Sequence, residues 1–321
     1  MEVIHDIDKA RIAHPCVQTI GGFDGLHLGH QYLLSQVKDA AAERQAKSMV
    51  ITFRRHPSAT LRPRQPVRLL TTLDDKLALL QSLGIDYVTV LDFTPQMAAM
   101  PARQFMAHIL RDKLHATALL IGYDHRFGHQ SRETFADYQH YGTLLGIEVI
   151  QALELPAPQG LHVSSSAIRQ ALTDGNITLA NQLLGRPYSL TGTVAHGQRI
   201  GHTLGFPTAN ITPCEPLQLL PRHAAYVVRA TAAGTTHIGM LYIGSRPTFR
   251  SLTEQRIEVH LLDFHGDLYG QPIRIEFLSF LRDEQHFQTP ADLQRQLQAD
   301  LQKIREEIPS YPPKGGGSVS G

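Results

Sequence analysis

Two histidines, His27 and His30, lie on either side of Gly29 shortly after a β-prone, mostly apolar run at residues 17–20. The run ends at two glycines, which predicts a strand followed by a tight turn. Apolar residues at helical spacing begin at Tyr32, so a helix should start beside the histidines. Backbone N–H groups at a helix start suit an anionic phosphate, and imidazoles can stabilise charge that develops on it.

Two common phosphate-binding signatures are absent, because the sequence has neither G-x-G-x-x-G after this strand nor G-x-x-x-x-G-K-[ST]. The remaining H-x-G-H pattern resembles that of the nucleotidyltransferase superfamily, in which such a motif binds the phosphates of ATP or CTP. The alternative is a tight turn with two solvated histidines, which is plausible in a chain with 18 of them.

Length and composition indicate an ordinary globular protein. A chain of 321 residues is long enough for two domains with separate cores. A formal net charge of +1 argues against a dedicated nucleic-acid binder. We expect no signal peptide and no membrane span. Cys16 and Cys214 have no metal or redox spacing, so they are expected to be reduced thiols in a cytoplasmic protein.

Predicted strands and helices alternate over residues 48–184, which indicates a Rossmann-like α/β fold with a mostly parallel sheet and helices on both faces. After the first strand, the expected strands are residues 49–53, 87–91, 116–122 and 147–150. The expected helices are residues 73–83, 102–114 and 133–145. Ligands in such folds bind at the carboxyl ends of the strands, where the histidine turn lies.

From residue 185 the pattern becomes all-β and predicts a small antiparallel barrel. Its expected strands are residues 225–230, 238–243, 257–264 and 273–280, and GDLYG at 266–270 has the composition of a hairpin turn. A final helix should begin after Thr289, with Pro290 at its first position. The predicted organisation is therefore a domain at 1–184, a domain at 185–308 and a flexible tail at 309–321.

Three further stretches of the first domain carry polar side chains at expected element ends. TFRRHPS places His56 after the second strand, and GYDHRFG supplies Asp124 and Arg126 after the fourth. VSSSAIR begins a helix whose serines can cap it and whose arginine can reach a phosphate. Its polar residues are Ser164, Ser165, Ser166 and Arg169. Taken alone, VSSSAIR is better explained as a capped surface helix than as a phosphate site.

In this order, the stretches resemble the adenylyltransferase half of the bacterial bifunctional riboflavin kinase/FAD synthetase family. Departures from the family pattern are Gly22, Arg55 and His125, where threonine, proline and phenylalanine are usual. The resemblance implies that His56, Asp124 and Arg126 contact FMN. It also implies ATP contacts and catalytic roles for both histidines. The implied ATP-binding residues are Gly22, Phe23, Asp24, His27, Gly29, His30, Ser164, Ser165, Ser166 and Arg169.

The second domain resembles the kinase half of the same family. GTVAHGQRIGHTLGFPTANI at 192–211 is similar to the flavokinase signature, and the resemblance implies that Thr208 and Asn210 hold Mg²⁺ and ATP phosphates. Glu258 matches the catalytic glutamate. Further ATP or flavin contacts are implied for Gly197, Gly205 and Arg282. Ala225 and Tyr242 depart from the family, which often has glycine and asparagine there.

A separate observation concerns phosphate charge. No lysine lies between Leu114 and Gln302, so a phosphotransferase here cannot use the lysine of a Walker loop or a protein-kinase strand. Mg²⁺, backbone N–H groups and arginines must meet that charge.

The leading hypothesis is an enzyme that phosphorylates riboflavin to FMN and adenylates FMN to FAD, with ATP and Mg²⁺. One alternative is a riboflavin kinase whose first domain is inactive, given the departures at Arg55 and His125. The other is a flavin- or RNA-binding regulatory protein. Its support is an arginine-rich segment with Arg54, Arg55, Arg62, Arg64 and Arg68. We expect riboflavin, FMN and ATP as partners, and neither membrane nor nucleic acid.

Overall fold

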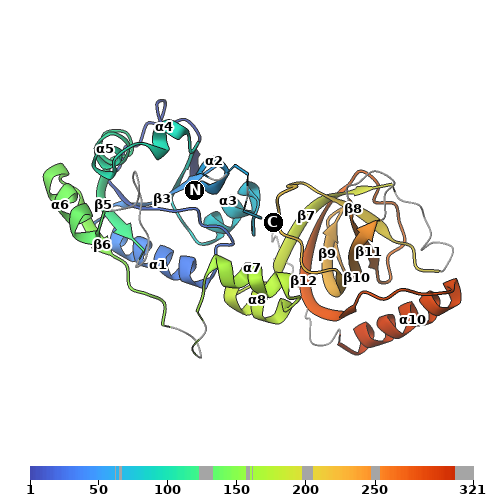
Figure 1. Cartoon of the computed structure of the whole chain (residues 1–321). Helices are drawn as coiled ribbons and strands as arrows, with labels where there is room; N and C mark the ends of the chain where they lie inside the picture. Colours follow the sequence, from blue (N-terminus) through green and yellow to red (C-terminus); the bar gives the residue numbers. More distant parts are fainter. Residues whose placement is uncertain are drawn as a thin grey trace. The chain divides into compact units, whose positions relative to one another are not determined.

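The computed structural model describes residues 1–61, 63–64, 67–122, 133–156, 160, 162–196, 205–246 and 254–307, without the side chains of 246, 254 and 255. The chain forms two compact units, Met1–Ser165 and Ser166–Gly321 (Figure 1). Asp124, His125, Arg126, Gly197 and the tail at 309–321 lie outside the described residues. The boundary predicted after residue 184 falls later than this division and stays a prediction.

The first unit contains a six-stranded sheet in the order β1-β4-β3-β2-β5-β6, and every neighbouring pair is parallel. The predicted parallel α/β architecture is therefore confirmed. Strand β1 was not predicted, and it adds an edge by pairing with β4. The strands are β1 (Glu2–Ile4), β2 (Cys16–Ile20), β3 (Lys47–Phe53), β4 (Tyr87–Leu91), β5 (Ala116–Ile121) and β6 (Glu148–Gln151).

Helices cover both faces of this sheet because the strands are apolar on both sides. On one face Val50 packs with Leu34 of α1 and Leu80 of α3, whereas the adjacent Ile51 packs on the other face with Met106 of η1. The helix predicted over 102–114 is a short α-helix followed by a π-helical segment. The helices are α1 (Leu28–Glu43), α2 (Ser58–Leu61), α3 (Leu73–Ser82), α4 (Pro95–Ala98), α5 (Ala102–Phe105), η1 (Met106–Arg111) and α6 (Phe135–Leu145).

The second unit is a closed antiparallel barrel, as the sequence predicted, with strand order β10-β11-β8-β7-β12-β9. The C-terminal helix begins at Pro290, also as predicted. Helix α7 begins at the last residue of the first unit. The elements are α7 (Ser165–Thr173), α8 (Ile177–Leu184), β7 (Tyr188–Ala195), β8 (Ala209–Pro213), β9 (Ala224–Ala232), β10 (Thr235–Arg246), β11 (Glu254–Leu261), β12 (Pro272–Asp283) and α10 (Pro290–Glu307). Among the described helices, none is long and apolar enough to span a bilayer.

The hairpin expected at residues 266–270 is wrong. Strand β11 pairs with β10 and β8, whereas β12 pairs with β7 and β9, so the segment joins strands that are not neighbours. Turn-forming residues report a local change of chain direction, but they do not decide which strands form hydrogen bonds with each other.

Helix α8 packs on the barrel. The Asn181 side chain donates to the carbonyl oxygen of Phe277 at 2.9 Å and accepts from the N–H of Tyr188 at 2.7 Å. Leu183 and Leu184 are buried. These contacts attach the helix to the unit that follows it.

A fragment that begins at Ser166 should therefore be more stable than one that begins at Gly185. Burying a leucine side chain contributes about 2 kcal/mol. Loss of Leu183, Leu184 and the Asn181 hydrogen bonds should lower the melting temperature by about 10 °C or more. Thermal denaturation followed by circular dichroism measures the difference, and Asn181→Ala in the longer fragment should reproduce part of it. Equal melting temperatures would show that α8 is not part of the cooperative unit.

Candidate active sites

The turn between β2 and α1 has an unusual backbone. Phe23, Gly25 and Leu26 have φ angles of 47°, 80° and 41°, all in the left-handed region. This conformation is ordinary for glycine but costs free energy at the other two residues, whose side chains are buried in the core. Packing therefore maintains a backbone shape that these residues would not adopt alone.

The two histidines meet at the start of α1. His27 caps the helix, and its Nδ1 accepts from the backbone N–H of His30 at 3.3 Å. The rings stack with centroids 3.7 Å apart. A Cβ on Gly29 would lie 3.3 Å from the His27 ring, so glycine makes room for it. Because Nδ1 accepts, the proton of a neutral His27 is on Nε2, where it can be donated to an oxygen.

Asp24 stabilises the turn through hydrogen bonds to its buried carboxylate. Its carboxylate accepts from the N–H of Leu70 at 2.9 and 3.1 Å and from the N–H of Thr71 at 3.1 Å. The residue is only 5% exposed. These hydrogen bonds hold the turn against the segment that precedes α3.

Lys76 is a further residue at the turn, and it was not predicted from the sequence. It is 7% exposed, and its Nζ donates to the carbonyl oxygen of Gly22 at 2.7 Å and to Thr52 Oγ1 at 3.3 Å. Burial lowers the pKa of Lys76 to about 8, against the opposing effect of the Asp24 charge. The signal was present in the sequence, because this lysine shares the apolar face of α3 with Leu73 and Leu80.

His56 follows β3 and lies beside the same turn. Its Nδ1 is 2.7 Å from Ser58 Oγ and accepts from the Ser58 N–H at 3.2 Å. A Cβ on Gly22 would lie 3.8 Å from the His56 ring, so the two residues are neighbours. Arg55 is exposed, and Arg54 forms an ion pair with Asp92 at 3.1 Å.

The serine segment also reaches the turn. Ser165 Oγ donates to the carbonyl oxygen of Asp24 at 2.9 Å. Ser164 is half-buried in the first unit, whereas Ser166 and Arg169 continue α7 in the second. In the first unit the structure therefore places the histidines, Gly22, His56 and Ser165 at the same turn, and their roles stay predictions.

In the barrel, backbone pairing aligns the predicted kinase residues around the wall. Asn210 of β8 is the partner of Glu258 of β11, which is also the partner of Tyr242 of β10. Tyr242 pairs with Ala225 of β9, and Ala225 pairs with Arg282 of β12. Directly paired residues share a face of a sheet. Ala225 and Tyr242, the two residues of this unit that depart from the family pattern, thus lie between Arg282 and Glu258, the predicted catalytic glutamate.

This face borders a cavity of about 330 Å³ between the barrel and α10. Glu258 and Arg282 contribute charge to it, and Leu293 and Leu297 of α10 contribute apolar surface. Its other lining residues are Phe206, Thr208, Ala225, Met240, Tyr242, Arg256, His260, Gln285 and Phe287. The lining combines apolar surface with a few fixed polar groups, which is typical of sites for small organic ligands.

Both key charges in this cavity have partners. Arg256 Nη2 lies 2.5 Å from Glu258 Oε1. Arg282 Nε donates to Asp300 Oδ2 of α10 at 2.8 Å, and Gln296 donates to the other oxygen of that carboxylate. The C-terminal helix therefore positions Arg282, a role for Asp300 that its helical context in the sequence did not reveal.

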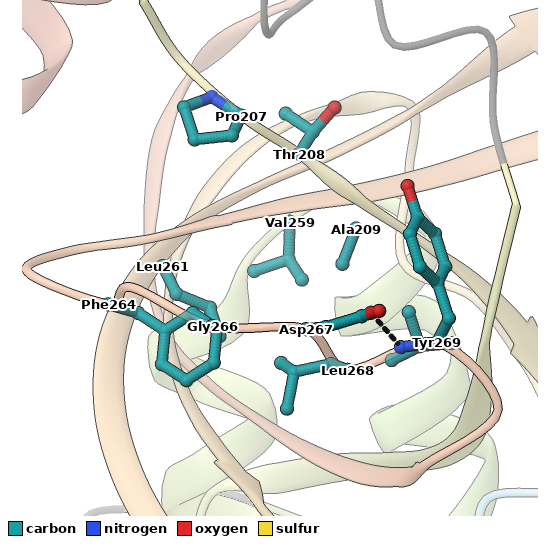
Figure 2. Close-up of a pocket in the computed structure, with 11 residues that line it drawn as sticks. Pro207, Thr208, Ala209, Val259, Leu261, Phe264, Gly266, Asp267, Leu268 and Tyr269 are labelled. Atoms are coloured by element: carbon teal, nitrogen blue, oxygen red, sulfur yellow. Dashed lines mark hydrogen bonds between the residues drawn. The ribbon is translucent and has the colours of Figure 1, made fainter.

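A second cavity, of about 570 Å³, lies on the other side of Thr208. Figure 2 shows Pro207, Thr208, Val259 and the segment 266–269 around it, with the Asp267 carboxylate accepting from the N–H of Tyr269 at 2.9 Å. Strand β11 separates the cavities, because Glu258 lines one and Val259 lines the other. Thr208 lines both. Residues 266–269, part of the segment that was wrongly expected to be a hairpin turn, thus line the larger cavity.

The donor chemistry near Thr208 fits Mg²⁺. Thr208 and Asn210 are two positions apart and half-buried, and they offer a hydroxyl and an amide oxygen. Mg²⁺ usually takes a few protein oxygens and completes its shell with phosphate and water. Within the described ranges, no group of three or more His, Cys, Asp or Glu side chains could hold a metal by itself. Gly205, at the start of this segment, has a φ of 81°.

Comparison with known proteins also separates the chain into two parts. A FAD synthetase family model matches residues 9–167, and a riboflavin kinase model matches residues 184–308. Proteins named bifunctional riboflavin kinase/FMN adenylyltransferase are similar over most of their length. The one from Listeria monocytogenes is 37% identical over 90% of this chain and 91% of its own. The one from Escherichia coli K12 is 36% identical over 94% and 96%.

A solved structure has the same overall fold. The crystal structure of a macrolide-efflux protein from Streptococcus pneumoniae has a TM-score of 0.85 with this chain at 30% identity. The match covers 94% of this chain and 98% of that one. The curated relatives and this structure therefore match both units and not one alone.

The buried Lys76 should make stability depend on pH. Its pKa is about 8 in the folded protein and 10.5 in the unfolded chain, so the unfolded state binds more protons between these values. The unfolding free energy of wild type should therefore rise relative to Lys76→Met as the pH increases from 8 to 10.5, by on the order of 3 kcal/mol.

Urea unfolding at pH 7.5 and pH 10 measures this difference. Lys38→Met, at an exposed position on α1, controls for the loss of a lysine charge. A difference between wild type and Lys76→Met that does not change with pH would contradict the prediction.

Proposed function

Because the chain belongs to the family of bifunctional riboflavin kinase/FMN adenylyltransferases, we propose that it catalyses both reactions. The second unit transfers the γ-phosphoryl group of ATP to riboflavin and gives FMN and ADP. The first unit transfers the adenylyl group of a second ATP to FMN and gives FAD and pyrophosphate. ATP and Mg²⁺ serve both steps, and we propose a cytoplasmic location, where both are abundant.

The observation that carries the kinase assignment is the shared wall at Thr208. The two cavities have volumes of about 570 and 330 Å³, and Thr208 lines both. ATP in the larger cavity would place its phosphates near Thr208, and Asn210 would approach the γ-phosphate from the face that it shares with Glu258. Riboflavin in the smaller cavity would place its 5′-hydroxyl near Glu258, across the same strands.

In the kinase reaction the 5′-hydroxyl oxygen attacks the γ-phosphorus and the bond to the ADP oxygen breaks. Glu258 accepts the hydroxyl proton, which a neutral alcohol must lose during the transfer. Arg256 fixes the orientation of the Glu258 carboxylate. Mg²⁺, held by Thr208 and Asn210 with phosphate oxygens, would neutralise phosphate charge. Asp300 holds Arg282, which lines the same cavity as Glu258.

In the adenylyl transfer a phosphate oxygen of FMN attacks the α-phosphorus of ATP, and pyrophosphate leaves. His27 and His30 donate to phosphate oxygens as charge develops, and the backbone of Gly22, Phe23 and Gly29 forms the phosphate cradle. His56, with Asp124 and Arg126 outside the described residues, contacts FMN. Ser164 and Ser165 of the first unit contact ATP. No protein nucleophile takes part.

The proposal is tested by incubating the protein with riboflavin, ATP and Mg²⁺ and following FMN and FAD by chromatography. FMN should appear first and FAD later. FMN without FAD would support the single-activity alternative. Flavin binding without either product would support a regulatory protein on the same scaffold.

His30→Ala should stop the second reaction alone. Removing one donor to a developing charge typically lowers the rate by roughly 10²–10³. FAD formation from FMN should fall by this factor, whereas FMN formation from riboflavin should stay near normal. Initial rates with each flavin as the starting substrate measure the two effects. Equal loss of both activities would indicate misfolding or one shared site.

Glu258→Gln is the reciprocal variant. The amide keeps the shape of the side chain but cannot accept the hydroxyl proton, and general-base catalysis contributes about 10²–10⁴-fold. Single-turnover FMN formation at saturating Mg²⁺-ATP should fall by this order, while flavin binding and FAD formation from FMN persist. A variant within about threefold of wild type, with chemistry rate-limiting, would leave Glu258 a structural role.

A further inference from the structure

Tyr242 occupies a defined place beside the proposed phosphoryl-transfer site. It lies on β10 as the direct cross-strand partner of Glu258, and it lines the 330 Å³ cavity. Its ring lies along the strand over Gly244, where a Cβ would come within 2.2 Å of the phenol oxygen. Glycine at 244 is therefore needed for this tyrosine orientation.

The phenol is paired with an acid from another part of the barrel. Tyr242 donates its hydroxyl proton to Glu284 Oε1, just beyond the end of β12. Glu284 Oε2 lies 4.0 Å from His223 Nδ1. Burial and this hydrogen bond raise the pKa of Tyr242, so the phenol keeps its proton. The phenol oxygen, whose proton is directed to Glu284, can then accept a hydrogen bond from a ligand in the cavity.

The register indicates which part of a flavin would meet this pair. Neighbouring strands are roughly 4.8 Å apart, so the backbone of Tyr242 lies one strand spacing from the backbone of Glu258. With the riboflavin 5′-hydroxyl at Glu258, the ribityl chain leads away from Thr208 and Asn210 and toward Tyr242. Phe287 and Leu293 line the same cavity and supply apolar surface that suits the isoalloxazine ring.

We propose that Tyr242, oriented by Glu284, accepts a hydrogen bond from a secondary hydroxyl group of the ribityl chain and makes the kinase selective for flavins with a polyol side chain. The proposal rests on the kinase function proposed above. The Tyr242 oxygen lines a partly apolar cavity and is oriented by its hydrogen bond to Glu284, so it favours a substrate that donates to it. An analogue without those hydroxyls leaves the acceptor side of the phenol oxygen without a donor in the filled cavity, which is the physical basis of strong discrimination.

The test compares riboflavin with a flavin that carries a 5-hydroxypentyl chain at N10. The analogue keeps the primary hydroxyl that is phosphorylated and lacks the secondary hydroxyls. Wild type should prefer riboflavin in kcat/KM by about 100-fold or more. Tyr242→Phe and Glu284→Gln should each reduce this preference by about tenfold, mainly through slower reaction of riboflavin.

The analogue also reports on folding, because a correctly folded variant should process it as wild type does. Equal loss with both substrates would overturn the proposal and assign the pair to cavity structure. A Tyr242→Phe variant with wild-type preference, together with a Tyr242→Ala variant that loses both substrates, would overturn it in favour of ring stacking. Absence of riboflavin phosphorylation by wild type would instead overturn the kinase function.

Discussion

Backbone hydrogen bonds between neighbouring strands determine which side chains meet at both sites. In the barrel they align Asn210, Glu258 and Tyr242 although these residues come from separate parts of the chain. In the parallel sheet they bring the ends of β2 and β3 together, so that Gly22 lies beside His56. Because side chains alternate along a strand, a one-residue slip of β11 would exchange Glu258 for an apolar neighbour.

The charges in the barrel site are paired before any ligand is present. Arg256 is held by Glu258, and Arg282 is held by the buried Asp300. Fixed charges need little reorganisation when charge moves in a reaction, which is the main advantage of a preorganised site. In the first unit, Asp24 and Lys76 maintain the turn between β2 and α1 in the same way, through hydrogen bonds that join it to neighbouring segments.

Local patterns in the sequence predicted the parallel sheet, the barrel and the helix at Pro290, because periodicity and turn residues report local structure directly. The histidine pair was predictable for the same reason, since both residues belong to one turn. Which strands pair with each other was harder to predict from the sequence. The segment at 266–270 has turn composition whether it joins paired strands or, as here, strands on different sides of the barrel.

Contacts between residues far apart in the sequence explain why the remaining residues at the sites were not predicted. Lys76 lies on an apolar helix face, but its partner Gly22 is a backbone carbonyl that no side-chain pattern marks. Asp300 has a helical context that suits an exposed acid, and only the fold brings Arg282 to it. Tyr242 was visible as a departure from the family, whereas its partner Glu284 became apparent only from the geometry.

Thr208 borders both cavities of the barrel, and this has a thermodynamic consequence. A ligand that moves this residue in one cavity alters the free energy of binding in the other. Reciprocity then requires that the second ligand change the affinity for the first by the same factor. Through this one threonine, the binding free energies of the two cavities can be coupled. The total binding free energy is the same whichever ligand binds first.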